Sequence, residues 1–418
     1  MSGLIINGSK RLCGELTVPG AKNSVLPLLA ATLLCKGDSV LHNCPMLSDV
    51  AVSLKILEHL GCKCTIEGHS VTVNADNAFG NVIPEFLMRE MRSSIVFMGA
   101  VAAKCGSVVM SLPGGCELGP RPIDLHIDAL SRLGADITCE GGHITCEALG
   151  GTKGADIHLR FPSVGATENV LLASVLSDGI TVIRNAAREP EIIDLCNFLK
   201  KCGANISGDG SDVITVTGVK SLHGAEHSVM PDRIVAATYL FGVAACSGRI
   251  KLNNINSEYI APMIALLKDS GCDIVADENS VMMSSAGRLK AFDTVSTQPY
   301  PGFPTDAGPL LVAYSTTLKG TSVFIENIFD NRFRYTDELI RLGAKIKTVG
   351  RVAVISGVKH LNGADVTACD LRGGAALVIA AMGAEGCSKI DKVCYIDRGY
   401  EKIEDSFNIL GADIERIN

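Results

Sequence analysis

Apolar residues follow a pattern that recurs six times along the 418 residues of this chain. In each repeat an apolar, alanine-rich stretch ends on one glycine, and a later stretch with apolar residues three or four positions apart ends on another. These spacings predict two helices per repeat of roughly 70 residues, the second one capped by its glycine. The first glycines are Gly37, Gly106, Gly179, Gly248, Gly320 and Gly386, and the second are Gly61, Gly134, Gly203, Gly271, Gly343 and Gly411.

Short segments of alternating apolar and polar residues, such as 213–216 and 352–355, predict strands beside these helices. A repeat with two helices and strands is longer than a propeller blade or a helical solenoid repeat, so the pattern favours an α/β layer structure. Two glycines around a leucine mark the same place in three repeats, at Gly8, Leu12 and Gly14, at Gly218, Leu222 and Gly224, and at Gly357, Leu361 and Gly363.

Six such repeats are too many for one hydrophobic core, so they predict two domains of three repeats each. The first strand pair, residues 4–18, has no helical repeat before it, and the last strand begins at Ile414, near the end of the chain. We therefore expect the N-terminal strands to complete the second domain. The predicted domains are residues 1–21 with 230–418, and residues 22–229.

Composition narrows the class of protein. The net charge of −7 argues against a nucleic-acid partner, and no run of about 18 uncharged apolar residues predicts a membrane span. The first 14 residues lack the apolar core of a signal peptide, so we expect a cytoplasmic protein. The 16 cysteines form no Cys-x-x-Cys pair, which argues against a zinc site or a disulfide framework. We expect no metal or cofactor, and cysteines that are mostly small core residues.

Cationic residues hold a fixed place in the repeats. Clustered at helix N-termini, lysine and arginine predict an anion site, because unpaired N–H groups and the helix dipole add positive potential there. The alternative is that some of them pair with Asp49, Asp124, Glu189 or Asp397 and hold loops. Four of them begin the first helix, namely Lys22, Arg92, Arg233 and Arg372, and four precede the second, namely Arg121, Arg188, Arg332 and Arg398.

Cys116 differs from the other cysteines because residues 112–122 form a segment rich in glycine and proline, in which a core cysteine would have little to pack on. Arg121 and the following helix N-terminus would favour its reactive thiolate. A thiol hydrolase would also need a histidine base held by a partner. His126 is near, but nothing in the sequence fixes an Asn or Asp beside it, so this alternative has little support.

These motifs together resemble the UDP-N-acetylglucosamine 1-carboxyvinyltransferases, a family of enolpyruvyl transferases, over essentially the whole chain. The resemblance implies two inside-out α/β barrels of three repeats each, with the active site in the cleft between them. The matching motifs are Pro19-Gly20-Ala21-Lys22-Asn23, the Cys116 segment with Arg121-Pro122-Ile123-Asp124-Leu125-His126, Ser163-Val164-Gly165-Ala166-Thr167, Phe303-Pro304-Thr305-Asp306, Asp370-Leu371-Arg372 and Asp397-Arg398-Gly399-Tyr400-Glu401.

The resemblance also implies a reaction: transfer of the enolpyruvyl group of phosphoenolpyruvate to the 3′-hydroxyl of UDP-N-acetylglucosamine, which begins peptidoglycan synthesis. By resemblance, Asp306 is the base and Cys116 is the acid and the target of fosfomycin. Lys22, Arg121 and Arg398 would hold the phosphate, Arg332 and Arg372 the carboxylate, with Arg92 and Asn23 close by. The sugar nucleotide would contact Asn23, Arg92, Arg121, Pro122, Ile123, Asp124, Leu125, Ser163, Val164, Gly165, Asp306 and Ile328.

One departure concerns the residues before Ser163, where this chain has Arg160 and the family often has a lysine one position later. Arg160 is a candidate to replace that contact to the diphosphate. Three alternatives stay open: a transferase for shikimate 3-phosphate, an RNA 3′-phosphate cyclase, and a paralogue that binds the sugar nucleotide without turning it over. The first does not account for the Cys116 segment, the second needs a basic surface, and the third has no use for an acid and a base.

Overall fold

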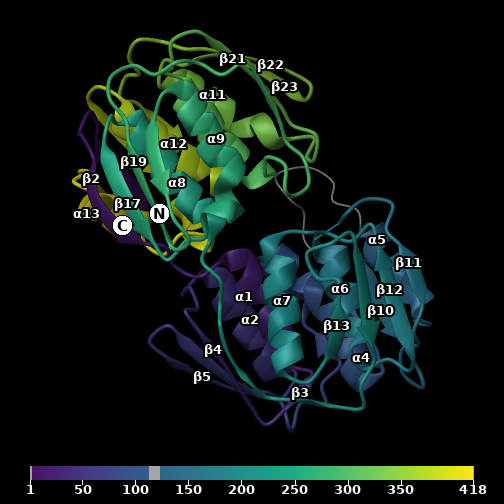
Figure 1. Ribbon diagram of the computed structural model, residues 1–418. Coiled ribbons are helices and arrows are strands. Elements are labelled where there is room, and N and C mark those ends of the chain that lie inside the picture. Colours follow the sequence, from purple (N-terminus) through teal and green to yellow (C-terminus); the bar gives the residue numbers. More distant parts are fainter. Residues whose placement is uncertain (1, 113–122, 418) are drawn as a thin grey trace. The chain divides into compact units, whose positions relative to one another are not determined.

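The computed structural model describes residues 2–112 and 123–417. The chain forms two compact units: unit 1 contains residues 2–19 and 231–417, and unit 2 contains residues 20–112 and 123–230. In each unit, helices lie inside and four-stranded sheets lie around them (Figure 1). This confirms the α/β repeats that the sequence pattern predicts and the inside-out arrangement that the family resemblance implies.

Three inner helices form the centre of each unit and contact one another. They are apolar on all sides, and nearly every residue in them is buried, which is expected of helices that solvent does not reach. In unit 2 they are α1 (Lys22–Thr32), α4 (Phe97–Cys105) and α6 (Val164–Ser174). In unit 1 they are α8 (Arg233–Ala245), α10 (Gly308–Ser315) and α12 (Leu371–Gly383).

The outer helices each contact the strand that follows them in the chain. Each is followed by its repeat glycine, and all six glycines have a positive φ, between 90° and 110°, as C-terminal caps do. These helices are α2 (Ser48–His59), α5 (Asp124–Arg132) and α7 (Pro190–Lys201) in unit 2, and α9 (Ala261–Ser270), α11 (Thr336–Arg341) and α13 (Ile403–Ile409) in unit 1.

Short helical segments precede several of the longer helices. Unit 2 has α3 (Glu85–Glu90) and the 3₁₀ turn η1 (Arg92–Val96) before α4. Unit 1 has the 3₁₀ turns η2 (Ser257–Ile260), η3 (Thr305–Ala307), η4 (Arg332–Tyr335) and η5 (Val393–Arg398). Three of these turns carry arginines of the predicted anion site.

Each sheet of unit 2 combines three strands of one repeat with a parallel strand from the segment between repeats. Their order is β16-β4-β6-β5, β7-β8-β10-β9 and β11-β12-β14-β13, and β3 pairs separately with β15. The strands are β3 (Cys35–Lys36), β4 (Asp38–His42), β5 (Lys63–Glu67), β6 (Ser70–Asn74), β7 (Val82–Ile83), β8 (Ser107–Ser111), β9 (Asp136–Glu140), β10 (His143–Glu147), β11 (Asp156–His158), β12 (Ile180–Arg184), β13 (Asn205–Ser207), β14 (Val213–Thr217), β15 (Leu222–His223) and β16 (Glu226–Ser228).

Unit 1 repeats this plan with both N-terminal strands. β1 lies antiparallel between β25 and β26, and β2 lies parallel to β17. The sheets are β24-β25-β1-β26, β18-β19-β17-β2 and β20-β21-β23-β22. The strands are β1 (Gly3–Asn7), β2 (Cys13–Thr17), β17 (Arg249–Asn253), β18 (Asp273–Ala276), β19 (Ser280–Ser284), β20 (Thr294–Ser296), β21 (Thr321–Ile325), β22 (Lys345–Val349), β23 (Val352–Ser356), β24 (Asp365–Thr367), β25 (Cys387–Asp391) and β26 (Ile414–Ile417).

Close packing requires glycine at positions 218 and 357. A Cβ at either position would lie 1.7 Å from a backbone oxygen, of Ser177 or Leu318 respectively. Each glycine N–H also donates to the glycine that follows the inner helix, Gly179 or Gly320. The repeated glycines therefore let two backbone segments approach closely.

The cysteine prediction is wrong for part of the set. Of the 15 cysteines described, seven are buried, and Cys13, Cys139, Cys387 and Cys394 are exposed. Three of the exposed residues lie on strands whose alternate side chains face solvent, and Cys394 lies in η5. A small side chain is tolerated on either face of such a strand, so residue type alone did not fix burial.

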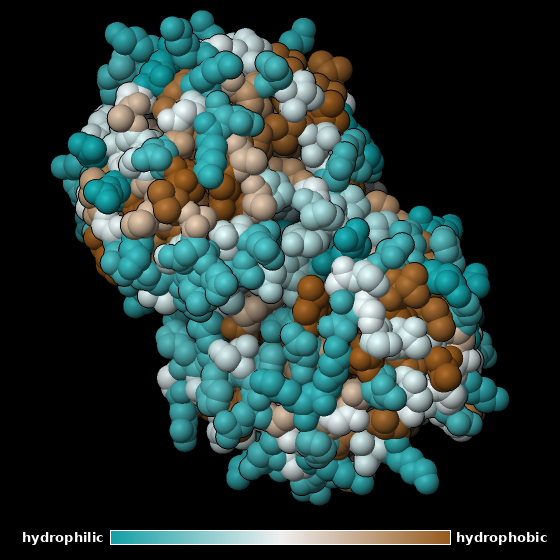
Figure 2. Space-filling view, in the orientation of Figure 1, coloured by the Kyte–Doolittle hydropathy of each residue, from teal (hydrophilic) through white to brown (hydrophobic). Residues whose placement is uncertain are grey.

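The visible surface of each unit is mostly hydrophilic, with scattered apolar residues (Figure 2). Some large apolar side chains, such as Phe79 and Leu149, are exposed, as they are on many proteins. Within the described residues, none of the helices is long and apolar enough to cross a membrane.

Candidate functional site

Asp306 lies in unit 1 at the turn η3, directly before α10. Its carboxylate faces two arginines: Arg332 Nη2 donates to Oδ1 at 3.2 Å, and Arg372 Nε lies 3.6 Å from Oδ2. The Asp306 side chain is 29% exposed, whereas both arginine side chains are only 2% exposed. A carboxylate that solvent can reach is thus flanked by two buried cations.

Arg372 is held by the start of α12. Asp370 caps this helix, because its Oδ1 accepts from the backbone N–H groups of Arg372 at 3.1 Å and Gly373 at 2.9 Å. The Arg372 guanidinium lies over the ring of Tyr400, with 5.3 Å from Cζ to the ring centroid. Among the described residues, none accepts a well-formed hydrogen bond from its three guanidinium nitrogens, and the contact with the Tyr400 hydroxyl is at most a poorly aligned one. Buried donors without an acceptor are costly, so this geometry favours an oxyanion ligand.

The charge of Arg372 is maintained despite its burial. Burial disfavours the charged guanidinium, but the nearby Tyr400 and Asp306 leave the pKa of Arg372 above its ordinary value. Burial likewise raises the pKa of Tyr400, whose hydroxyl lies 2.8 Å from Thr238 Oγ1. Tyr400 therefore stays neutral and serves as a flat support for the cation.

Arg332 approaches the same carboxylate from η4. Its Nη2 also donates to the Thr305 carbonyl at 3.2 Å, and its guanidinium lies 5.8 Å from the centroid of the Phe329 ring. Its Nε has no hydrogen-bond partner among the described residues. Arg332 and Arg372 together form a pair of buried forks, the geometry with which arginine binds a planar carboxylate.

Arg398 and Ile328 complete the predicted residues of unit 1. Arg398 ends η5 and is half-buried. The preceding Asp397 accepts two hydrogen bonds from Arg416, at 2.9 and 2.8 Å, which anchors this turn to β26. Ile328 lies shortly after β21, and its backbone N–H donates to Glu326 Oε1 at 2.7 Å. Arg416, with which Asp397 pairs here, is not one of the cations of the repeat pattern.

In unit 2, Lys22 and Asn23 begin α1. Lys22 Nζ lies 2.7 Å from Asp49 Oδ2, and both side chains are at most 10% exposed. The alternative that a cation of the pattern pairs with Asp49 is therefore confirmed for Lys22. This ion pair holds the Lys22 ammonium group at the start of an inner helix. Arg92 begins η1, where it is half-buried.

Six of the residues predicted for the nucleotide lie in two adjacent segments of unit 2. Ile123 is the N-cap of α5, and Asp124 and Leu125 begin that helix. Ser163 is the N-cap of α6, and Val164 and Gly165 begin it. The two helices touch at their starts, because a Cβ on Gly165 would lie 3.1 Å from His126 Cε1.

Arg160 lies beside these two helix starts. Its Nη2 lies 2.6 Å from Asp124 Oδ2, and both side chains are at least half exposed. Asp124 thus pairs with Arg160, which is not one of the cations of the repeat pattern. An exposed pair of this kind is weak and readily exchanged for a ligand.

His126 has the partner that the sequence did not reveal. Asn169 of α6 lies 2.8 Å from His126 Nδ1, donates to the Ile95 carbonyl at 3.0 Å, and accepts from Gly99 N–H at 2.7 Å. Nothing in the sequence fixed this Asn beside His126, because Asn169 is 43 residues away along the chain. Burial lowers the pKa of His126 to about 4, so its ring is neutral at neutral pH.

Three predicted residues, Cys116, Arg121 and Pro122, lie outside the described residues. Among the other predicted residues, the structure brings two groups together. Unit 1 brings together Asp306, Arg332 and Arg372, and unit 2 brings the starts of α5 and α6 together. Among the described residues, no group of three or more His, Cys, Asp or Glu side chains has a metal-binding arrangement.

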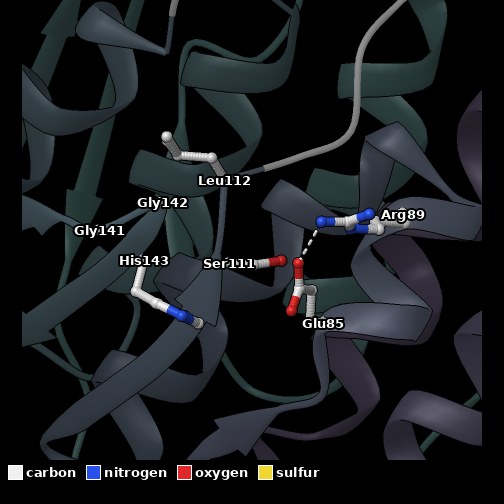
Figure 3. Close-up of a pocket in the computed structure, with 7 residues that line it drawn as sticks. All are labelled: Glu85, Arg89, Ser111, Leu112, Gly141, Gly142 and His143. Atoms are coloured by element: carbon white, nitrogen blue, oxygen red, sulfur yellow. Dashed lines mark hydrogen bonds and ion pairs between the residues drawn. The ribbon is translucent and has the colours of Figure 1, made fainter.

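A pocket of about 500 Å³ in unit 2 has, among the residues that the structure describes, none of the predicted ones in its lining (Figure 3). Its one basic side chain, Arg89, pairs with Glu85 at 2.5 Å, so the lining carries little net charge for an anion. The arginine pair around Asp306 is better suited to anionic chemistry than this pocket. The lining residues are Glu85, Arg89, Ser111, Leu112, Gly141, Gly142 and His143.

Comparison with known proteins agrees with this geometry. Residues 6–407 match the family described as EPSP synthase (3-phosphoshikimate 1-carboxyvinyltransferase). Among solved structures, the enolpyruvyl transferase NikO from Streptomyces tendae has a TM-score of 0.89 and 22% identity, covering 99% of this chain and 98% of that one. EPSP synthase from Acinetobacter baumannii has a TM-score of 0.76 and 18% identity over the full length of both. These two likenesses establish the fold, and the chain belongs to the EPSP synthase family.

Curated relatives narrow the family. UDP-N-acetylglucosamine 1-carboxyvinyltransferase 2 of Caldanaerobacter subterraneus subsp. tengcongensis is 51% identical over 99% of both chains. UDP-N-acetylglucosamine 1-carboxyvinyltransferase 1 of Symbiobacterium thermophilum is 47% identical over 99% of this chain and 95% of its own. Within its family, the chain therefore belongs with the UDP-N-acetylglucosamine 1-carboxyvinyltransferases.

Proposed function

We propose that this chain transfers the enolpyruvyl group of phosphoenolpyruvate to the 3′-hydroxyl of UDP-N-acetylglucosamine and releases phosphate. The observation that carries the proposal is the pair of buried arginines, Arg332 and Arg372, on either side of the partly exposed Asp306. Full-length relatives at 47–51% identity bear this activity in their names. The reaction would be the first committed step of peptidoglycan synthesis.

The chemistry is an addition followed by an elimination. In the addition, Asp306 takes the proton of the sugar 3′-hydroxyl, and the 3′-oxygen bonds to C2 of phosphoenolpyruvate. At the same time Cys116 supplies a proton to the methylene carbon C3. The product is a tetrahedral intermediate that carries both the sugar oxygen and the phosphate on C2. In the elimination, the Cys116 thiolate left by the addition takes back a proton from C3, the C2–C3 double bond is restored, and the bond from C2 to the phosphate oxygen breaks. The proton held by Asp306 leaves with the released phosphate, so both side chains return to their starting forms.

The arginine pair is suited to hold the carboxylate of phosphoenolpyruvate through both steps. Arg332 and Arg372 are fixed by Phe329, Tyr400 and the helix starts, so their forks need little reorganisation when the substrate binds. We assign the phosphate to Lys22, Arg121 and Arg398, which suits a point charge and two forks. Asp49 holds Lys22 in a charged, oriented form.

We assign the sugar nucleotide to the two touching helix starts of unit 2. Backbone N–H groups at the starts of α5 and α6 are donors for a phosphate or a carbonyl oxygen. Arg160 can move from Asp124 to the diphosphate, because their pair is exposed. The full set assigned to the sugar nucleotide is Asn23, Arg92, Arg121, Pro122, Ile123, Asp124, Leu125, Ser163, Val164, Gly165, Asp306 and Ile328.

Acceptor specificity tests this proposal. Phosphate release from phosphoenolpyruvate is measured with UDP-N-acetylglucosamine or with shikimate 3-phosphate, each at several concentrations. Release with the sugar nucleotide alone supports the proposal, and release with shikimate 3-phosphate alone contradicts it. If neither acceptor gives release but the sugar nucleotide binds in calorimetry, the chain is a binding paralogue.

A further inference from the structure

Glu326, which directly follows β21, is a fully buried carboxylate that the reaction described above does not use. It has no exposed surface, and four donors surround it. Its Oε1 accepts from Thr297 Oγ1 at 2.9 Å and from the backbone N–H groups of Ile328 at 2.7 Å and Phe329 at 3.2 Å. Its Oε2 accepts from Thr305 Oγ1 at 2.8 Å.

A buried carboxylate is costly unless its oxygens accept hydrogen bonds, and both oxygens of Glu326 do accept them. Its donors lie on three separate segments: the end of β20, the turn η3, and the residues that follow β21. One side chain therefore fixes three segments relative to one another. None of this could be read from the sequence, because Thr297, Thr305 and Ile328 are spaced irregularly around Glu326.

Two of the three segments that Glu326 holds lead to the candidate site, namely those of Thr305 and Phe329. Thr305 directly precedes Asp306, and its carbonyl accepts from Arg332 Nη2. Phe329 supports the Arg332 guanidinium with its ring. A shift of the Glu326 carboxylate would therefore move Asp306 and the support of Arg332 together.

We propose that Glu326 is a positioning residue, which acts through Thr305 and the backbone of Ile328 and Phe329 to place Asp306 and Arg332 for the enolpyruvyl transfer. This inference rests on the proposed function for its catalytic meaning. Its structural part, that the bond from Thr305 sets the position of Asp306, stands independently of which reaction the chain performs.

Two threonines offer a matched pair of variants. Thr305→Val removes the one hydrogen bond that Oε2 accepts among the described residues, next to Asp306. Thr297→Val removes a bond to Oε1 and also the hydroxyl that accepts from Asn327 N–H at 2.8 Å. Thr297→Val breaks more bonds in a more buried place, but Oε1 keeps its two backbone donors. Loss of stability and loss of positioning are therefore separated.

We expect Thr305→Val to lower kcat by about 10- to 100-fold, as small displacements of reacting groups do, with KM for both substrates within about twofold. Thr305→Ser retains the hydroxyl and should restore kcat to within about threefold of wild type. Thr297→Val should keep kcat within about threefold although it unfolds at a lower temperature. Equal losses of kcat in the two valine variants, or none in Thr305→Val, would overturn the proposal.

A second readout separates this inference from the proposed function. In protein labelled with ¹³C at aspartate side chains, the Asp306 resonance is identified by its absence in Asp306→Asn. Its chemical shift should change in Thr305→Val and stay within line width in Thr297→Val and Thr305→Ser. If the wild type releases no phosphate, the proposed function fails while this comparison still decides the positioning. An Asp306 resonance that is the same in all variants would refute the positioning role of Glu326.

Discussion

Replacing Arg372 by methionine should have opposite effects on binding and on folding. Methionine keeps much of the length and apolar character of the arginine stem but removes the guanidinium, whose nitrogens have no well-formed hydrogen-bond partner among the described residues. The variant therefore removes donors that the folded, ligand-free chain leaves unsatisfied. Asp306 keeps its bond from Arg332 and its 29% exposure, so its charge is not left isolated.

The magnitudes follow from these contacts. Each buried donor without a partner costs about 1–3 kcal/mol, and the lost attraction to Asp306 at 3.6 Å offsets part of that gain. We expect the free energy of unfolding to be unchanged or to rise by up to about 2 kcal/mol. Two charge-assisted bonds to the carboxylate of phosphoenolpyruvate are worth about 1.5–3 kcal/mol each, so the apparent KM for this substrate should rise at least about 100-fold.

Urea denaturation without ligand and initial rates against phosphoenolpyruvate concentration measure the two effects. Arg288→Met is the control, because Arg288 donates to three carbonyl oxygens, of Thr317, Leu318 and Gly357, at 2.8–3.0 Å. It should lose about 1–3 kcal/mol of stability and keep its KM. A loss of more than about 2 kcal/mol in Arg372→Met, or an unchanged KM, would show that Arg372 serves the fold and not the substrate.

Three further predictions concern other residues of the account. Asp306→Asn keeps size and polarity but removes the base, so kcat should fall at least about 100-fold while affinity for the sugar nucleotide in calorimetry changes little; near-normal turnover would exclude the base role. The pKa of His126 is lowered from 6.5 to about 4, so the folded chain binds fewer protons than the unfolded chain between these values, and stability is lost as pH falls. Urea denaturation should show the wild type losing about 2 kcal/mol more than His126→Gln from pH 7 to pH 5, and equal losses would mean that the histidine is not buried in its neutral form. Brief exposure to fosfomycin with UDP-N-acetylglucosamine should add one label, on the peptide that contains Cys116; peptide mass mapping that finds label on many cysteines, or none on Cys116, would contradict its assignment.

The repeat architecture could be predicted because its determinants are local. Gly61 and its five equivalents end the outer helices with positive φ, and Gly357 admits a close backbone contact; both requirements restrict the residue type at one position. The inner helices could also be predicted, because their apolar residues form continuous local stretches of the sequence. The order of the strands could not be predicted in this way, because the pairing of β1 with β25 joins residues nearly 400 positions apart.

The candidate site was less visible in the sequence than the fold. The cations could be placed at helix starts by their period, but their partners could not: Asp49 pairs with Lys22, while Asp397 pairs with Arg416 outside the pattern. Asn169 and Glu326 left no signal, since a single polar residue near an apolar stretch has no spacing that reveals its contacts. Such residues become recognisable only when burial and hydrogen bonds are known.

The fate of one oxygen atom tests enolpyruvyl transfer most directly. The chain is supplied with UDP-N-acetylglucosamine and with phosphoenolpyruvate carrying ¹⁸O at the oxygen between carbon and phosphorus, and the released phosphate and the sugar product are examined by mass spectrometry and NMR. Addition and elimination break the bond from C2 to this oxygen, so the account predicts that the label leaves in phosphate and that a vinyl ether appears on the 3′-oxygen. Unlabelled phosphate, with the label left on pyruvate and no vinyl ether on the sugar, would contradict the account.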